Sequence, residues 1–187
     1  MNNSPNFKKG FTLVETMVAI SILMLGILGP LSIASSGLRN SLFAKDQVTA
    51  YYLAQEGIEY VRYVRDNNYL KKNDWLGGLS DCTEQYGCAV DTEKWFTTNI
   101  SVTTKCTSTD CGNDDLLYKI NSNQHYTHQS GSENTATPFT RIIKVENTPN
   151  TPTDKEIKVT STVTWQTGAG QKSFTLTENV FNIYKTL

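Results

Sequence analysis

Four cysteines are the residues of this chain whose type and spacing point most directly to chemistry. They form two close pairs, Cys82 with Cys88 and Cys106 with Cys111, with five and four residues between the partners. Zinc sites favour two to four intervening residues, so a zinc cluster is the weaker interpretation. Short loops close most readily, which favours a disulfide within each pair. Cross-pairing between the two loops stays open, because four cysteines permit three connectivities.

Histidines and clustered oxygens are the other candidate ligands. His125 and His128 are the only histidines, and no carboxylate or cysteine accompanies them at a metal-ligand spacing, so they are interpreted as loop histidines. A turn-rich segment gathers four oxygen-bearing side chains: Asp110, Asn113, Asp114 and Asp115. Oxygen ligands suit Ca²⁺, but the EF-hand spacing is absent, so this segment is a weak calcium candidate and a solvated turn is favoured. No metal and no cofactor is expected.

No motif of the chain indicates an enzyme. The sequence shows no nucleophile–base arrangement, no Gly-rich phosphate loop and no HExxH motif. Its 17 basic and 18 acidic residues nearly cancel. Because nucleic-acid-binding proteins carry a basic patch or excess, nucleic acid is not indicated as a partner.

One carboxylate, Glu15, lies at the head of a membrane-length apolar run. Residues 16–38 include no Lys, Arg, Asp or Glu over 23 positions. Roughly 20 apolar residues span the hydrocarbon core as a helix. Lys8 and Lys9 precede the run and favour a cytoplasmic N-terminus. We therefore expect a single-pass protein of the cytoplasmic membrane with everything after Arg39 outside, where disulfides persist.

Two ordinary interpretations of this run leave Glu15 unexplained. A secretory signal could be cleaved at residues 34–36, but its apolar core would be shorter. A plain signal anchor fits the length. In both cases an ionised carboxylate in the bilayer costs roughly 2.5–3.5 kcal/mol on insertion scales. The partner that offsets this cost must be a positive charge from another molecule.

The stretch KKGFTLVETMVAISILMLGILGPL, residues 8–31, resembles the N-terminus of type IV pilins and of the pseudopilins of type II secretion and competence systems. The resemblance implies that a prepilin peptidase cuts between Gly10 and Phe11 on the cytoplasmic side and methylates the new N-terminus at Phe11. A glycine before the cut suits close approach of the backbone to the peptidase. The resemblance further implies that Glu15 pairs with the Phe11 ammonium of a neighbouring subunit, which would set axial register.

The implied function is that of a minor pilin or pseudopilin, a structural subunit of a type IV pilus or type II secretion-like filament. Its implied partners are other pilin or pseudopilin subunits, the prepilin peptidase, the cytoplasmic membrane and the inner-membrane assembly platform. The protein would wait in the membrane and then join an extracellular or periplasmic filament. The alternative is a membrane-tethered extracytoplasmic binding domain that does not polymerise. Which machine uses the subunit stays open.

The expected domain organisation has four parts. Residues 1–10 form a cytoplasmic leader that is removed, and 11–38 form the transmembrane and filament-core helix. Residues 39–68 continue as an amphipathic helix, and 69–187 form an extracytoplasmic β-rich head with the cysteine loops. The helix is expected to end at residues 66–68 and to kink or unwind near three residues: Gly26, Gly29 and Pro30. Gly57 lies on the packed stripe, where it would allow close approach of a sheet.

Alternating apolar and polar residues predict strands in the second half of the chain. The clearest are 139–145 and 157–165, followed by a turn at 166–171 and a strand over 174–184 with a slip near Glu178. Shorter strands are expected at 100–104 and 116–120, and a polar loop at 130–137. The predicted fold class is α+β, with a long N-terminal helix and an antiparallel sheet packed on its outer half.

Overall fold

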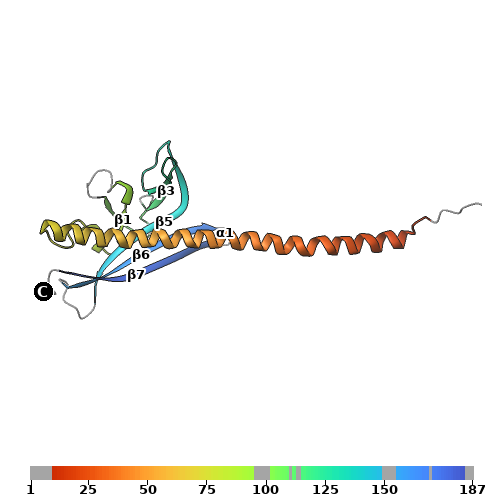
Figure 1. Cartoon of the computed structure of the whole chain (residues 1–187), viewed down its shortest axis with the longest axis horizontal. Helices are drawn as coiled ribbons and strands as arrows, with labels where there is room; N and C mark the ends of the chain where they lie inside the picture. Colours follow the sequence, from red (N-terminus) through yellow and green to blue (C-terminus); the bar gives the residue numbers. More distant parts are fainter. Residues whose placement is uncertain are drawn as a thin grey trace, which may run out of the picture. The chain divides into compact units, whose positions relative to one another are not determined.

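The computed structural model describes residues 10–94, 102–109, 111–112, 115–148, 155–168 and 170–183. The chain divides into two compact units, Met1–Lys45 and Asp46–Leu187, which are called here the N-terminal unit and the C-terminal unit. Helix α1, Leu13–Lys71, contributes its first part to one unit and its second part to the other (Figure 1). Each unit is described by itself.

Helix α1 is continuous over 59 residues, including Pro30. Proline removes one backbone hydrogen bond and its ring presses on the carbonyl four residues earlier, which here belongs to Gly26. The turns on either side keep their own hydrogen bonds, and the helix continues. The local unwinding expected around Gly26, Gly29 and Pro30 is therefore not found.

The end of α1 lies at Lys71, beyond the 66–68 boundary expected from the sequence. Lys72 adopts a left-handed conformation with φ of 56°. The Lys72 N–H donates to the Tyr69 carbonyl at 3.1 Å, and the Asn73 N–H donates to the Asn68 carbonyl at 3.0 Å. These two bonds form a Schellman motif, which satisfies the last carbonyls of a helix. Asn68 does not end the helix; its side-chain amide donates to the carbonyl of Gly77 at 2.8 Å and so holds the following loop.

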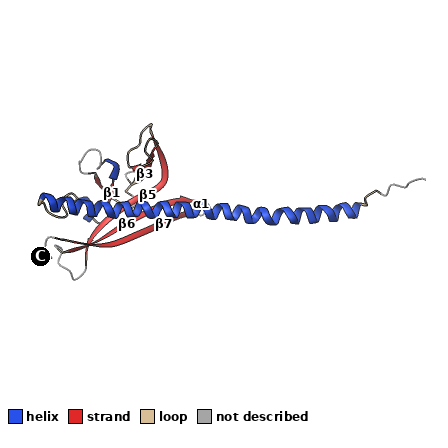
Figure 2. Cartoon of the chain, in the orientation of Figure 1, coloured by secondary structure: helices blue, strands red, loops and turns tan. Residues whose placement is uncertain are grey.

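The strands form one antiparallel sheet in the C-terminal unit (Figure 2). A short 3₁₀ helix, η1 (Ser80–Thr83), precedes them. The strands are β1 (Cys88–Val90), β2 (Thr103–Lys105), β3 (Leu116–Ile120), β4 (Tyr126–Thr127), β5 (Asn134–Asn147), β6 (Glu156–Thr167) and β7 (Gly170–Phe181). Strand β5 pairs with β1, β3 and β6, and β6 pairs with β7. The long N-terminal helix and the antiparallel sheet confirm the predicted α+β, pilin-like fold class.

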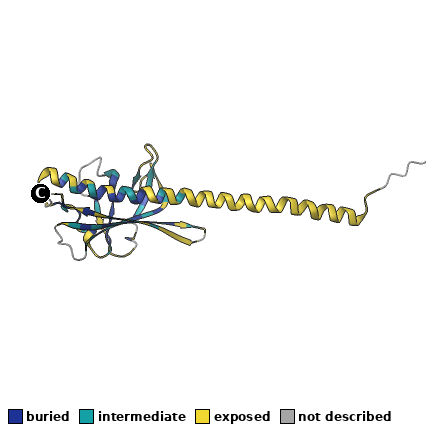
Figure 3. Cartoon of the chain, turned by 60° about the horizontal axis from the view of Figure 1, so that its bottom comes forward, coloured by how far each residue is buried: buried dark blue, intermediate teal, exposed yellow. Residues whose placement is uncertain are grey.

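The core of the C-terminal unit lies between one face of this sheet and the second part of α1. Every second residue of β6 from Ile157 to Trp165 is buried, which is the period expected of a strand with one covered face. The matching buried face of α1 comprises seven apolar or small residues: Ala50, Leu53, Ala54, Gly57, Ile58, Val61 and Val64. Figure 3 shows this buried stripe in dark blue.

Gly57 is the point where α1 comes closest to the sheet. A Cβ atom at this position would lie 2.6 Å from the Ser161 hydroxyl oxygen and 3.0 Å from the Ile143 Cδ1 atom. The first distance is shorter than real Cβ contacts and the second is tighter than most, so a larger residue here would have to displace the side chains of Ser161 and Ile143. The prediction that Gly57 allows close approach of a sheet is confirmed.

Strand β5 begins earlier than the sequence indicates. Residues 134–137, predicted within a polar loop, pair with β3 in a register that places Asn134 opposite Ile120. The Thr137 hydroxyl also donates to the Leu117 carbonyl at 2.7 Å. Pro138 follows, where the pairing of β3 with β5 shifts register, and a proline without an N–H suits such a bulge. Pairing with a neighbouring strand, which the local pattern does not reveal, extends β5.

The hairpin of β6 and β7 is longer and more regular than predicted. Pairing runs from Glu156 opposite Phe181 to Thr167 opposite Gly170 without a shift, so the turn is tighter than 166–171. The slip expected near Glu178 is absent. Glu178 keeps the inward phase of the strand because the Arg62 side chain of α1 donates to its carboxylate at 3.0 Å through Nε.

The shorter elements were predicted unevenly. Strand β3 coincides with the predicted 116–120 strand. Strand β2 begins at Thr103, within the predicted 100–104 segment, whose residues 100 and 101 lie outside the described residues. Strands β1 and β4 and the helix η1 were not predicted. They are two to four residues long, too short to show a period.

Candidate processing and assembly site

The residues at the predicted cleavage position are accessible. Gly10 and Phe11 precede the first helical residue, Leu13. The Phe11 side chain is 81% exposed, and an added Cβ at Gly10 would meet no atom within 4 Å. A peptidase binds an extended, exposed backbone. In a helix the backbone N–H and C=O groups are bonded to each other and are not accessible to the enzyme. The start of α1 after these residues leaves the Gly10–Phe11 bond outside the helix.

Thr12 and Glu15 have a local role at the start of α1. The Glu15 backbone N–H donates to the Thr12 hydroxyl at 3.2 Å, so Thr12 is the N-cap and Glu15 the third helical residue. Thr-x-x-Glu is the sequence pattern of a capping box, and an acidic residue in the first turn is favourable near the positive end of the helix dipole. This explains locally why an acid can stand at this position.

The local role does not account for a carboxylate in a bilayer. An acid near a helix N-terminus gains typically 0.3–1 kcal/mol. Burial of a charged side chain in the hydrocarbon core costs roughly 2.5–3.5 kcal/mol on insertion scales and more in simulations. The capping contribution is smaller than the cost. A compensating charge is needed wherever Glu15 leaves water.

Three hydroxyls inside the apolar run donate to carbonyls of the same helix. The hydroxyl of Thr16 donates to the Leu13 carbonyl at 2.8 Å, and that of Ser21 donates to the Met17 carbonyl at 2.8 Å. Ser36 does the same toward Ser32 at 3.0 Å. Such bonds remove the penalty of a hydroxyl in lipid. The Glu15 carboxylate carries a charge that no bond of this kind compensates.

The apolar surface of this part of α1 is uncovered in the single chain. Every residue from Gly10 to Lys45 is exposed, including 15 large apolar side chains between Phe11 and Leu38. Among the described residues, α1 is the one helix with the length and hydropathy of a membrane span, with an 18-residue window of mean hydropathy 2.3 and none of it buried. The helix fits an anchor in the inner membrane.

The cysteines are bonded in the two short loops. Cys82 of η1 is bonded to Cys88 of β1, and Cys106 is bonded to Cys111. The four residues are buried. The Cys106 N–H donates to the Gly87 carbonyl at 3.0 Å, which joins the two loops. Gly87 itself has φ of 78°, and a Cβ there would lie 2.4 Å from the Ile143 carbonyl oxygen.

The two histidines lie at either end of β4 and do not meet. His125 is exposed and its Nδ1 lies 2.8 Å from the Glu93 carboxylate. His128 is largely enclosed, and its Nδ1 lies 3.1 Å from the Leu116 carbonyl. Within the described residues no group of three His, Cys, Asp or Glu side chains forms a metal site. Both histidines lie in loop positions that flank β4, as the sequence predicts, and His128 differs from His125 in being partly buried.

Most of the segment proposed as a weak calcium site lies outside the described residues. Asp110, Asn113 and Asp114 lie outside the described residues. Asp115 is described and is 2% exposed, so it is not part of a solvated turn. Its carbonyl accepts from the Arg141 N–H at 3.0 Å, which fixes it beside β5.

Sequence reasoning missed Arg141, the largest fully buried side chain of the described residues. Its Nη1 donates to the Leu53 carbonyl of α1 at 3.1 Å, and its Nη2 donates to the Val90 carbonyl of β1 at 2.8 Å. Nη1 also lies 3.2 Å from the Glu56 carboxylate, which accepts a further bond from the Thr92 hydroxyl. Arg141 therefore joins helix, sheet and loop. The alternation of β5 could have revealed it, because Arg141 stands at one of the inward-facing positions, between Phe139 and Ile143.

The surroundings of Arg141 also affect the pKa of His128. Burial and, to a smaller extent, the nearby Arg141 guanidinium lower the pKa of His128 to about 4, against the opposing effect of Asp91. Because Nδ1 faces a carbonyl, it is the protonated nitrogen, and the neutral tautomer leaves Nε2 unprotonated. The buried Nε2 has no hydrogen-bond partner in the described structure. This histidine is therefore neutral at pH 7.

The N-terminus, in contrast to the C-terminal unit, resembles known proteins. Residues 5–29 match the family model of the prokaryotic N-terminal methylation motif. No curated protein and no solved structure matches the chain. The match covers the Lys-Lys-Gly-Phe sequence, the capping Thr12, Glu15 and most of the apolar run. The chain thus carries the N-terminal methylation motif that is the signature of type IV pilins and pseudopilins.

Proposed function

We propose that the protein is a minor pilin or pseudopilin, a structural subunit that a prepilin peptidase cuts between Gly10 and Phe11 before assembly into a type IV pilus or type II secretion-like filament. The observation that carries this proposal is the methylation motif over residues 5–29. The exposed, non-helical Gly10 and Phe11 support the cleavage position. The motif favours a structural protein, and we propose no enzymatic activity for it.

Cleavage supplies the charge that Glu15 requires. In the uncut chain the Phe11 nitrogen is an amide without charge. The cut turns it into an ammonium, which N-methylation leaves positive. The Glu15 carboxylate of an incoming subunit then pairs with the Phe11 ammonium of a neighbour. Each charge would be costly alone in a low-dielectric surrounding, and together they offset much of that cost. A subunit in the wrong axial position leaves both unpaired.

The uncovered apolar side chains between Phe11 and Leu38 form the proposed interface with other subunits. Fully burying one large apolar side chain is worth about 1.5–3 kcal/mol, so 15 of them are worth tens of kcal/mol. This surface must be covered by lipid before assembly and by neighbouring helices afterwards. The C-terminal unit would then face the periplasm or the outside as part of the filament surface. The inner-membrane assembly platform is the proposed partner in this transfer.

The first experiment determines the N-terminus of the mature protein. Mass spectrometry of the protein from cells with an active prepilin peptidase should find a chain that begins with N-methylated Phe11. A peptidase-deficient strain is the control and should yield the uncut chain. An intact Met1 start in the presence of the peptidase would contradict the proposal and favour a membrane-tethered domain that does not polymerise.

The second experiment tests the charge pair. Glu15→Gln keeps the size of the side chain but leaves the neighbour's ammonium without a partner. Removal of one member of a buried charge pair costs about 3–5 kcal/mol, which predicts a loss of incorporation into filaments of more than about a hundredfold. The matched control is Glu133→Gln at an exposed position of the C-terminal unit. Normal incorporation of the Glu15→Gln protein would show that the pair does not drive assembly.

A further inference from the structure

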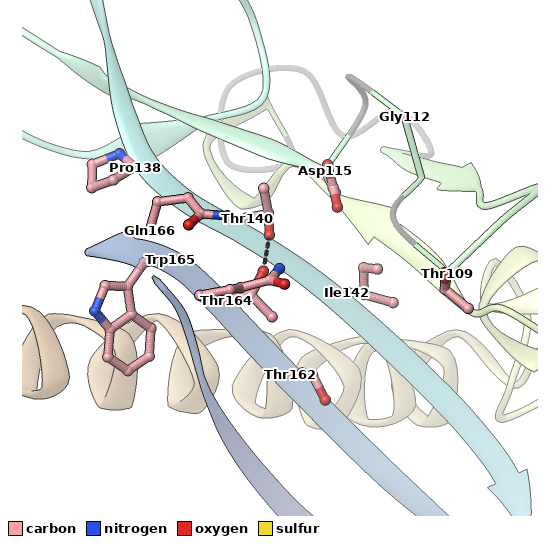
Figure 4. A pocket seen from close by; sticks show the side chains of 11 residues that line it. Thr109, Gly112, Asp115, Pro138, Thr140, Ile142, Thr162, Thr164, Trp165 and Gln166 are labelled. Carbon is pink, nitrogen blue, oxygen red and sulfur yellow. Dashed lines mark hydrogen bonds between the residues drawn. The ribbon is translucent and has the colours of Figure 1, made fainter. Parts of the chain in front are cut away.

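A cavity of about 230 Å³ lies on the sheet face that points away from α1. It lies between the outward side of strands β5 and β6 and the segment before β3 (Figure 4). Six polar side chains carry the argument: Asp115, Thr140, Thr162, Thr164, Gln166 and Gln171. None of the described residues that line the cavity is Lys, Arg or His.

The polar lining follows from the alternation of β5 and β6. Thr140 and Thr164 stand opposite each other in the register, and their hydroxyls are hydrogen-bonded (Figure 4). Trp165, the next residue, has the opposite phase; it is 3% exposed, and its ring packs near Phe139 in the core. The cavity therefore meets hydroxyls and amides from the strands beside the apolar side chains of Pro138 and Ile142, while the indole ring of Trp165 packs toward the core.

Threonine alone would not indicate a binding site, because it is common on the solvent side of strands. The concave shape and the added groups distinguish this place from the rest of the face. The carboxylate-bearing Asp115 is 2% exposed, although it belongs to a loop. Gln166 and Gln171 face each other across the hairpin and are exposed at the rim.

The donor and acceptor inventory defines the ligand class. Hydroxyls and primary amides both donate and accept hydrogen bonds, whereas a carboxylate only accepts. A phosphate or carboxylate ligand would need a cation or an array of donors, and the described lining holds a carboxylate instead. A ligand rich in neutral hydroxyls matches the polar groups, and the C–H face of a sugar ring matches the apolar side chains of Pro138 and Ile142. The volume is below the roughly 300–1,000 Å³ of sites for drug-sized ligands, which suits a single ring.

We propose that this cavity binds one ring of a neutral carbohydrate, with the hydroxyls of Thr140 and Thr164 bonding to sugar hydroxyls and the buried carboxylate of Asp115 disfavouring an anionic ligand. Gln166 and Gln171 contact the sugar from the rim.

The surface beside the cavity can receive further rings of a glycan chain. The Thr162 hydroxyl, which lines the cavity, lies 3.3 Å from the Thr175 hydroxyl of β7. In the same register Thr160 stands opposite Thr177. A row of hydroxyls thus continues from the cavity across the hairpin, on the outward phase of both strands. This makes a polymer of neutral sugars a better fit than an isolated small molecule.

Direct binding measurements on the full-length protein in mild detergent test the inference. Methyl glycosides of neutral hexoses and of N-acetylhexosamines are titrated, with inorganic phosphate and calcium chloride in separate arms. Ligand-observed NMR or calorimetry should find at least one sugar with a dissociation constant of about 1 mM or tighter. Binding by phosphate or calcium with no sugar bound, or no binding in any arm, overturns the proposal.

Substitutions inside and outside the cavity test whether the sugar binds at this position. Thr164→Val removes one hydroxyl without changing shape, and Gln166→Ala changes the exposed rim, where folding is not at risk. Each should weaken sugar binding about three- to tenfold, the range of one net hydrogen bond. Thr177→Val, on the same face but outside the cavity lining, should leave single-ring binding within about twofold. Unchanged binding in both cavity variants contradicts the assignment. Because cleavage and Glu15 play no part in this assay, its failure leaves the filament proposal untouched.

Discussion

The two parts of helix α1 have the same secondary structure and opposite surroundings. From Leu13 to Lys45 every residue is exposed, and the exposed side chains are mostly apolar. From Asp46 to Lys71 nine residues are buried, all on one stripe that faces the sheet. The second part finds its partner in its own chain. The large apolar side chains of the first part, up to Leu38, stay uncovered by the described residues of the same chain.

This difference shows which interactions are internal to the chain and which require another molecule. In the C-terminal unit the apolar stripe, the close approach at Gly57 and the Arg141 contacts are complete within one subunit. In the N-terminal unit three hydroxyls bond to helix carbonyls, but the apolar surface is uncovered and the charge of Glu15 is uncompensated. Folding of the C-terminal unit and assembly through the N-terminal unit should therefore respond to different substitutions.

The largest effect on folding is expected from Arg141→Ala. Removing one partner of a buried charged cluster costs about 3–5 kcal/mol, because the Val90 carbonyl loses its side-chain donor and the Glu56 carboxylate loses its cationic partner. Urea denaturation followed by tryptophan fluorescence should show this loss. Cleavage after Gly10 should continue, since it depends on the N-terminal unit. A block of cleavage in this variant would break the separation of the two units.

Acidification should destabilise the C-terminal unit through His128. Its pKa in the folded state is about 4, below the usual 6.5, so the unfolded chain binds the additional proton between these values. Stability is then full above about pH 6.5 and falls by up to about 1.4 kcal/mol per pH unit toward pH 4. Denaturation midpoints measured across this range should show the slope.

Two histidine variants identify the source of that slope. His128→Gln should flatten it, because the titrating group is removed. His125→Gln is the matched control, since His125 is exposed and lies only three residues away. An equal slope in the His128→Gln protein would assign the pH dependence to the carboxylates of the unit instead.

Gly57→Ala tests the close contact between the helix and the sheet. Alanine normally favours a helix by about 1 kcal/mol over glycine. Here the added methyl group overlaps the Ser161 hydroxyl, and overpacking costs typically 1–3 kcal/mol. We expect a net destabilisation, measured by thermal unfolding. Gly37→Ala, where no atom lies within 4 Å, is the control and should show no loss.

The smallest effect is expected from the Arg62–Glu178 ion pair. The hydrogen bond that Arg62 donates to the Glu178 carboxylate raises the pKa of Arg62, but the two side chains are 38% and 33% exposed. Exposed pairs contribute about 0.2–1 kcal/mol. Glu178→Gln should therefore change the free energy of unfolding by less than about 1 kcal/mol. A loss comparable to that of Arg141→Ala would mean that this pair, and not Arg141, anchors the helix.

Much of the fold could be predicted because it follows from local periodicity. The β3 strand and the central parts of β5, β6 and β7 have alternating residues, and α1 has a helical stripe. The boundaries were less predictable. The end of α1 is set by a Schellman motif at Lys72 and Asn73, and residues 134–137 become a strand through pairing with β3.

The errors at charged positions share one cause. Glu178 was expected to disturb the alternation of β7, and Arg141 was overlooked inside a strand. Both keep the inward phase because a partner distant in sequence meets them: Arg62 for Glu178, and the backbone of α1 and β1 for Arg141. A local pattern does not contain such partners.

By itself, the sequence determined the N-terminal unit: the membrane-length helix, the Gly10–Phe11 position and the isolated Glu15. These features depend on neighbours within a few residues and on the surrounding solvent, which composition describes well. Only the tertiary structure decided the Arg141 cluster, the lowered pKa of His128 and the polar cavity on the outward face of the sheet. Each of these arises where segments far apart in the chain meet, and contact between such segments changes desolvation and hydrogen bonding in ways that no local spacing encodes.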